Sequence, residues 1–253
     1  MKIAIVTGAS SGMGKEFVLQ MAEKYSKLDE IWVISRRKEK LTELALDVTA
    51  PLRCFAFDIS NNASLSDFAN ELESQSPDVK LLINCAGYGK YGEFATGNYE
   101  DEIGMIDVNC KGLTAITHMV LPYMSKKSRI INVASAAAFS PQPDFAVYAA
   151  TKAYVLSFSR ALNRELLERG ISVTAVCPGP VKTAFFETAY NDEKIPLLKR
   201  LTMADAKKVV QKAIKDAALS DELSVYGVKM KIFRIAAKLL PHRFILSLMK
   251  KKA

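Results

Sequence analysis

The chain has 253 residues, of which 49% are hydrophobic and 25% are charged, and its formal net charge at pH 7 is +8. This length allows one or two domains, but no linker, low-complexity block or repeat of about 20–50 residues divides the chain. No uninterrupted apolar run is long enough for a transmembrane helix, which argues against a membrane-spanning protein.

The first predicted elements form a nucleotide-binding pattern. The apolar run 2–6 predicts a buried parallel strand, the glycine-rich segment TGASSGMG follows at 7–14, and a helix is predicted over 15–25. Glycines let the backbone approach a pyrophosphate closely, and a helix N-terminus offers free N–H groups to phosphates. The pattern therefore predicts the first half of a dinucleotide-binding unit. A simple tight turn before a helix is the alternative.

Strands and helices alternate along the rest of the chain. Strands are predicted over 31–34, 52–57, 80–83, 129–133 and 171–176, and helices over 39–48, 62–73, 99–125 (in two parts) and 146–168. This alternation predicts a Rossmann-type, doubly wound parallel sheet in a three-layer α/β/α domain. Ligands of such sheets bind at the carboxyl ends of the strands.

The helix predicted over 146–168 carries Tyr148 and Lys152, which lie one turn apart on the same face. An ammonium group near a phenol favours the phenolate, so this tyrosine is expected to exchange a proton near neutral pH. The pair alone is weak evidence, because many helices carry Tyr and Lys at this spacing by chance.

Several motifs in the right order make the chain resemble the short-chain dehydrogenase/reductase family over nearly its whole length. They are TGASSGMG at 7–14, NCAG at 84–87, PGPVKT at 178–183 and the catalytic set Asn109, Ser135, Tyr148 and Lys152. The resemblance implies an oxidoreductase that transfers hydride between a nicotinamide cofactor and a carbonyl/alcohol pair.

The resemblance also implies a role for each member of the catalytic set. Tyr148 is the expected general acid in reduction and general base in oxidation. Lys152 is expected to lower the pKa of Tyr148 and to bind the nicotinamide ribose. Ser135 can hydrogen-bond the carbonyl oxygen. Asn109 is expected to kink its helix and to hold a water that leads protons from the lysine to solvent.

Charge after the second strand predicts the cofactor NADP. An acidic residue here would bind the ribose hydroxyls of NAD, but the chain has Arg36 and Arg37, and a guanidinium can bind a 2′-phosphate. The alternative is that both arginines are solvated cations. The predicted cofactor-binding residues are Gly8, Ser10, Ser11, Gly12, Met13, Gly14, Arg36, Arg37, Asp58, Ile59, Asn84, Ala86, Gly87, Tyr148, Lys152, Pro178, Gly179, Val181 and Thr183.

A substrate lid is expected over about 183–203, by resemblance. It carries the apolar residues Phe185, Phe186, Tyr190, Ile195, Leu197 and Leu198. Ala137 and Phe139 are expected to contact substrate from the other side, together with Phe185 and Phe186. These residues favour an apolar, lipid- or steroid-like substrate. Equally, the lid side chains could simply pack on the body.

The segment 227–253 is predicted to be a basic C-terminal extension of a catalytic domain over 1–226. The extension contains eight Lys or Arg and no Asp or Glu, whereas residues 1–226 carry 27 basic and 27 acidic residues. Pro241 should divide it into two helical pieces. It could lie as an amphipathic helix on an anionic membrane, or pack on the core or on a partner subunit with its lysines solvated.

Other expectations follow from what the sequence lacks. It has no cluster with metal-ligand spacing, no nucleic-acid-binding motif and no segment before the first strand that would serve as a signal peptide. Its four cysteines show no CxxC spacing and suggest reduced thiols, so a cytoplasmic enzyme is expected. Homodimers or homotetramers are expected by analogy with the family. A nucleotide-binding regulatory or scaffold protein on the same fold is the alternative function.

Overall fold

The computed structural model describes residues 1–190 and 203–248. Its centre is a seven-stranded sheet in the order β3-β2-β1-β4-β5-β6-β7, in which every neighbouring pair is parallel. The strands are β1 (Lys2–Thr7), β2 (Glu30–Ser35), β3 (Leu52–Ala56), β4 (Asp78–Asn84), β5 (Arg129–Val133), β6 (Ser172–Val176) and β7 (Leu223–Ser224). The strand order reverses between β1 and β4, which is where open sheets of this kind bind ligands.

Both faces of the sheet are apolar, and this is why helices cover both. In β1, Ala4 and Val6 belong to one hydrophobic cluster, whereas Ile3 and Ile5 belong to another. Side chains of a strand alternate between the two faces, so each face buries its own set. The alternation of elements in the sequence reflects the same requirement.

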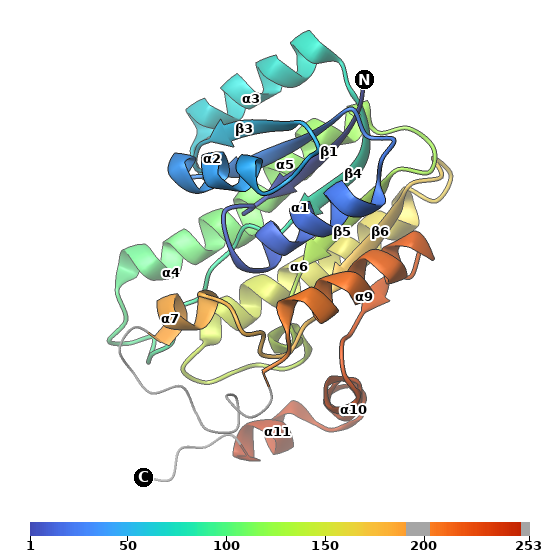
Figure 1. The fold of residues 1–253 in the computed structure, drawn as a ribbon. Coiled ribbons are helices and arrows are strands. Elements are labelled where there is room, and N and C mark those ends of the chain that lie inside the picture. The colour runs from blue at the N-terminus through green and yellow to red at the C-terminus, as the bar shows by residue number, and fades with distance from the viewer. Residues whose placement is uncertain (191–202, 249–253) are drawn as a thin grey trace.

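Helices form the two outer layers (Figure 1). The first layer contains α1 (Gly12–Lys24), α2 (Lys38–Leu46) and α9 (Ala206–Ala218), and the second contains α3 (Asn62–Gln75), α5 (Leu113–Val120) and α6 (Ala146–Glu165). The predicted three-layer α/β/α architecture is confirmed.

The long helix predicted over 99–125 is interrupted, as expected, but its interruption is a change of helix type. Residues of α4 (Tyr99–Ile106) continue into a π-helical segment, η1 (Asp107–Gly112), before α5 begins. Asn109 lies within η1. Because π-helical turns are rare and costly, they mark positions where a side chain is placed for a specific contact.

Two elements near the C-terminus were not predicted. The strand β7 is only two residues long and carries no pattern of its own. The helix α9 has a recognisable start in the sequence, because Asp205 is a residue type that favours the N-cap position. In the structure Asp205 caps the helix by accepting a hydrogen bond from the backbone N–H of Lys207. Its buried apolar residues follow helical spacing, at Val209, Val210, Ala213, Ile214 and Ala217.

The segment after β6 contains α7 (Phe185–Tyr190), and the C-terminal segment contains α10 (Val228–Leu239) and α11 (His242–Leu248). Pro241 separates the last two helices, as predicted. Figure 1 shows α10 and α11 together below the three layers, beyond α9. The lid residues Ile195, Leu197 and Leu198 lie outside the described residues.

Candidate active site

A cavity of about 730 Å³ lies at the carboxyl ends of the strands. This volume is within the range of small-molecule and cofactor sites. Most of the predicted site residues line it, namely Gly8, Ser10, Ser11, Gly12, Met13, Gly14, Arg36, Arg37, Asp58, Ile59, Ala86, Gly87, Ser135, Ala137, Tyr148, Pro178, Gly179, Val181, Thr183, Phe185 and Phe186. These residues come from the loops that follow each of the strands β1 to β6 and from the helices α1, α6 and α7, which converge on one space.

The glycine loop has a backbone that only glycine adopts without strain. Gly8 has φ +70° and Gly12 has φ +55°. A Cβ at Gly8 would come within 2.7 Å of the backbone of Ala86, so the loop packs directly on the NCAG segment. Thr7 fixes this contact, because its Oγ1 accepts hydrogen bonds from the N–H groups of Cys85 and Ala86, each at 3.1 Å. The resulting cradle at the start of α1 fits the pyrophosphate of a dinucleotide.

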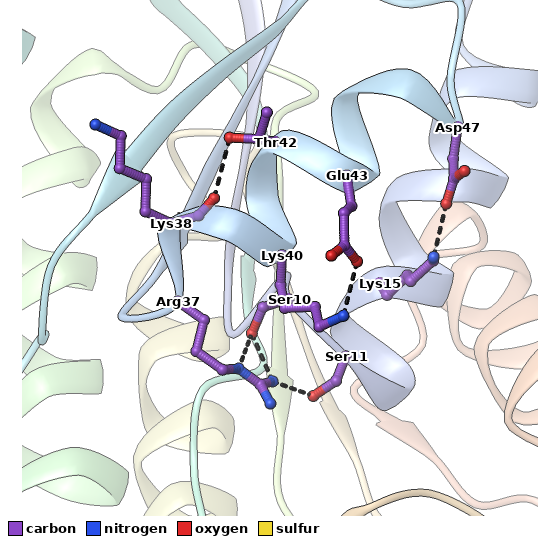
Figure 2. Close-up of polar contacts among 9 residues, drawn as sticks. All are labelled: Ser10, Ser11, Lys15, Arg37, Lys38, Lys40, Thr42, Glu43 and Asp47. Atoms are coloured by element: carbon purple, nitrogen blue, oxygen red, sulfur yellow. Dashed lines mark hydrogen bonds and ion pairs between the residues drawn. The ribbon is translucent and has the colours of Figure 1, made fainter.

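Arg37 reaches back onto the glycine loop (Figure 2). Its Nε and Nη2 donate to Ser10 Oγ at 3.1 and 2.7 Å, and Nη2 also donates to Ser11 Oγ at 2.6 Å. Arg36 instead points to Asp58, with Nη1 3.6 Å from Oδ2, and is largely exposed. The two adjacent arginines therefore have different environments, and Arg37 is the one held in place by several hydrogen bonds.

Asp58 is held as a carboxylate in the loop just after β3. Burial raises its pKa, but the hydrogen bonds from the N–H and hydroxyl of Ser60 and the charge of Arg36 outweigh burial, so the net pKa lies below its ordinary value. The Ser60 bonds are 2.9 and 2.7 Å long. This carboxylate can accept further hydrogen bonds from a ligand in the cavity.

Tyr148 is buried in an aromatic environment. Its ring stacks on Phe145 with centroids 4.3 Å apart and contacts Phe185 at 5.5 Å. Burial raises the pKa of Tyr148 to about 12, although a hydrogen bond from Ser135 opposes this shift. The phenol therefore keeps its proton at neutral pH in this structure.

The predicted lowering of the Tyr148 pKa by Lys152 is not observed, because Lys152 is not among the causes that shift this pKa. The spacing prediction is correct, because both residues are on α6 and the ammonium lies 5.7 Å from the centroid of the Tyr148 ring. However, Nζ donates to the carbonyl of Val133 at 2.8 Å, and burial dominates the titration of the phenol. Burial also lowers the pKa of Lys152, to about 8.

Lys152 and Asn109 lie behind the cavity wall, around Gly87. A Cβ on Gly87 would come within 2.8 Å of Asn109 Oδ1 and 3.3 Å of Lys152 Nζ. The Asn109 amide donates to the Tyr88 carbonyl at 2.9 Å and to Thr151 Oγ1 at 3.0 Å, and Oδ1 accepts from Tyr88 N–H at 3.0 Å. Asn109 therefore ties η1 to the segment after β4 and to α6. Its predicted role in holding a water stays a prediction.

Ser135 faces the cavity with its hydroxyl oriented. Its Oγ accepts from the N–H of Ala137 at 3.1 Å, at the start of the 3₁₀ turn η3 (Ala136–Phe139). That contact leaves the hydroxyl proton available for donation to a ligand oxygen.

Two further predicted residues do not line the cavity. Asn84 is buried below it, where its amide donates to Thr117 Oγ1 and to Asn132 Oδ1, each at 2.9 Å. It links β4 to α5 and β5. Phe139 is not among the residues that line the cavity, and its ring packs against Phe233, with centroids 6.3 Å apart, so its role as a substrate contact stays a prediction.

Among the cavity residues that the sequence reasoning missed, two groups come from segments to which no site residue was assigned. Gln142 and Phe145 precede α6, and Lys229, Met230 and Phe233 come from α10. Met230 fits against Gly179, where a Cβ would lie 2.6 Å from Sδ. The apolar spacing of Met230 and Phe233 indicated a packed helix face, but nothing in the sequence indicated what that face would cover.

Over residues 1–190 and 203–248, no group of three or more His, Cys, Asp or Glu side chains is arranged to hold a metal ion. Nor does any disulfide join the four cysteines, all of which are free.

Comparisons with known proteins agree with this geometry. The family described as short chain dehydrogenase matches residues 2–194. A protein of Staphylococcus epidermidis described as an uncharacterized oxidoreductase is 32% identical over 81% of this chain and 88% of its own length.

Solved structures share the fold. A short-chain dehydrogenase from Sphingobium yanoikuyae in complex with NADPH has a TM-score of 0.79 at 24% identity and covers 100% of this chain and 98% of its own. A short chain dehydrogenase/reductase from Burkholderia phymatum in complex with NAD has a TM-score of 0.79 at 22% identity, with 100% and 96% covered. Because the family match covers residues 2–194, we conclude that the chain belongs to the short chain dehydrogenase family.

Proposed function

We propose that this protein is an NADP-dependent oxidoreductase that interconverts an apolar ketone and the corresponding secondary alcohol. The observation that carries the proposal is that Ser135 and Tyr148 both line the cavity, near enough to each other that Ser135 lowers the pKa of the phenol against the effect of burial. Such a pair can orient a carbonyl oxygen and transfer a proton to it.

The protein groups supply the proton and the orientation. A bound reduced nicotinamide would supply the hydride to the carbonyl carbon. The Ser135 hydroxyl donates a hydrogen bond to the carbonyl oxygen, and the phenol of Tyr148 donates its proton there, which completes the alcohol. The raised pKa of Tyr148 keeps that proton in place at neutral pH, as reduction requires.

An apolar substrate is supported by the walls beside Tyr148. Phe145 and Phe185 contact its ring, and Phe186, Met230 and Phe233 also line the cavity. Apolar walls of this kind favour a ligand that buries hydrocarbon surface and presents one polar group.

A screen of NADPH oxidation with ketones of increasing apolar size tests the proposal. We expect turnover that improves with apolar size, because larger groups bury more surface in the cavity. If NADPH binds but none of the ketones or aldehydes is reduced, the protein is better described as a nucleotide-binding regulatory protein on the same fold.

The preference for NADP is proposed from the two arginines after β2. Related structures contain either NADPH or NAD, so the local charges are the relevant evidence. Arg37 already contacts the hydroxyls of Ser10 and Ser11, and a phosphate placed there could accept hydrogen bonds from all three side chains. Arg36 adds a second positive charge at the cavity.

Replacement of Arg37 by alanine should change cofactor preference. We expect KM for NADPH to rise about 10- to 100-fold, because a charge-assisted bond to the phosphate is lost, while KM for NADH changes little. Lys15→Ala is the matched control, since it also removes a positive charge near the glycine loop. Lys15 pairs with Asp47 at 2.7 Å and does not line the cavity. Equal effects of Arg37→Ala on both cofactors would contradict the assignment.

A further inference from the structure

The helix α10 has an exposed apolar stripe on the side opposite to the one that packs. Val228, Ile232, Ile235 and Leu239 are 72%, 61%, 58% and 74% exposed. They follow one another at spacings of four, three and four residues, so they form one continuous face. Met230, Phe233 and Ala237 occupy the opposite face and pack on the body of the protein. Large exposed side chains gathered in this way indicate a binding surface.

Basic residues flank the stripe, and acidic residues are missing from the whole segment. Lys231, Arg234 and Lys238 form a row along one side of the stripe, and Lys229 lies on the other side; all four are exposed. Residues 227–253 contain no Asp or Glu. A helix with an apolar face bordered by basic residues is typical of proteins that lie in the surface of an anionic bilayer.

We propose that α10 docks this protein onto an anionic membrane surface. The apolar stripe would enter the boundary between headgroups and acyl chains, and the flanking lysines and arginine would contact acidic headgroups. Within residues 1–190 and 203–248, no helix is long and apolar enough to cross a bilayer. The attachment is therefore peripheral.

The main alternative, a second copy of the chain, fits the charges less well. A two-fold interface would place the same basic rows on both subunits against each other, with no carboxylate in the segment to compensate them. Acidic lipids provide the compensating charge that another copy lacks.

Docking by α10 would also bring the cavity close to the lipid. Lys229, Met230 and Phe233 of this helix line the cavity, while its opposite face carries the stripe. An apolar substrate dissolved in the bilayer could then reach the site without crossing water. This consequence rests on the proposed function, whereas the docking itself does not.

Flotation with vesicles tests the docking without any measurement of turnover. We expect the full chain to float with vesicles of phosphatidylcholine and phosphatidylserine, and to bind those of phosphatidylcholine alone much less. Binding should weaken strongly at about 1 M salt, where the Debye length falls to about 3 Å.

A pair of matched variants separates the stripe from general charge. Ile232→Glu adds a carboxylate within the stripe, and Leu219→Glu adds one at a side chain that is 66% exposed but lies at the end of α9. We expect Ile232→Glu to reduce vesicle binding at least about tenfold and Leu219→Glu to reduce it only slightly.

Three results would overturn the proposal. They are no binding to the anionic vesicles, equal binding by the two variants, and a vesicle-free dimer in analytical ultracentrifugation that Ile232→Glu dissociates and Leu219→Glu leaves intact. The last result would assign the stripe to an interface between copies. Circular dichroism of both variants would show whether they are folded.

Discussion

Replacement of Tyr148 by phenylalanine is expected to lower turnover by about 100-fold to 10⁴-fold while the protein stays folded. The range is the usual contribution of a positioned general acid, and Tyr148 is the group proposed to supply the proton. Phenylalanine keeps the ring that stacks on Phe145 and contacts Phe185, so packing should change little. Steady-state rates of ketone reduction, with NADPH fluorescence to measure cofactor binding, check both parts.

Tyr154→Phe is the matched control for this experiment. Tyr154 lies on the same helix, but it is exposed and its hydroxyl contacts Thr114 Oγ1 at 2.8 Å. The control should retain nearly full activity. If Tyr148→Phe kept activity equal to that of Tyr154→Phe, the proton would have to come from another group, and the proposed mechanism would be wrong.

The core of the fold could be predicted from the sequence because its signals are local. More than half of the residues in each of the first six strands are apolar, and inside a parallel sheet such runs are buried on both faces, as Ile3, Ala4, Ile5 and Val6 are. The glycine loop is equally local, since the positive φ values of Gly8 and Gly12 require the residue itself. The strand β7 was not predicted, because two residues carry no period, and the helix α9 was not predicted either.

Contacts between distant segments could not be predicted in the same way. Nothing within 35–37 shows that Arg36 pairs with Asp58 while Arg37 turns toward Ser10 and Ser11. The placement of α10 is a second case. The boundary predicted at residue 226 treats the tail as an extension, yet Met230 and Phe233 help to form the cavity wall. Tertiary contacts of this kind depend on the whole fold, not on local pattern.

The same limit explains the prediction about Lys152. Sequence spacing placed its ammonium near the phenol, but the degree of burial decides the sign of the net pKa shift. Burial raises the pKa of Tyr148 and lowers that of Lys152, so it shifts both titrations in favour of the neutral form. A site that holds a buried amine is therefore expected to reduce the stability of the fold.

Replacement of Lys152 by methionine should stabilise the protein at neutral pH while turnover falls by about 100-fold or more. The lowered pKa, about 8 against 10.5, corresponds to a penalty of roughly 3 kcal/mol. The variant also loses the hydrogen bond to Val133, which costs it about 1 kcal/mol. The net gain in its free energy of unfolding is therefore about 2 kcal/mol at pH 7.

The gain should depend on pH in one direction. Below pH 8 the amine is charged in both the folded and the unfolded chain, and the penalty is complete. Between pH 8 and 10.5 the folded chain loses its proton first, so the wild type becomes more stable relative to the methionine variant as the pH rises. Urea unfolding of both proteins from pH 7 to pH 10 measures this difference, in which the other titrating groups cancel.

Lys111→Met provides the control, because Lys111 is exposed on η1 and pairs with Asp107 at 3.6 Å. A surface pair of this kind contributes less than about 1 kcal/mol, and its removal should add no trend over the same pH range. A constant difference between wild type and Lys152→Met would mean that the amine is not desolvated in the folded state. A difference in unfolding free energy that decreases as the pH rises would mean that the buried lysine at the proposed active site costs the fold stability. Selection for packing alone would have replaced such a residue.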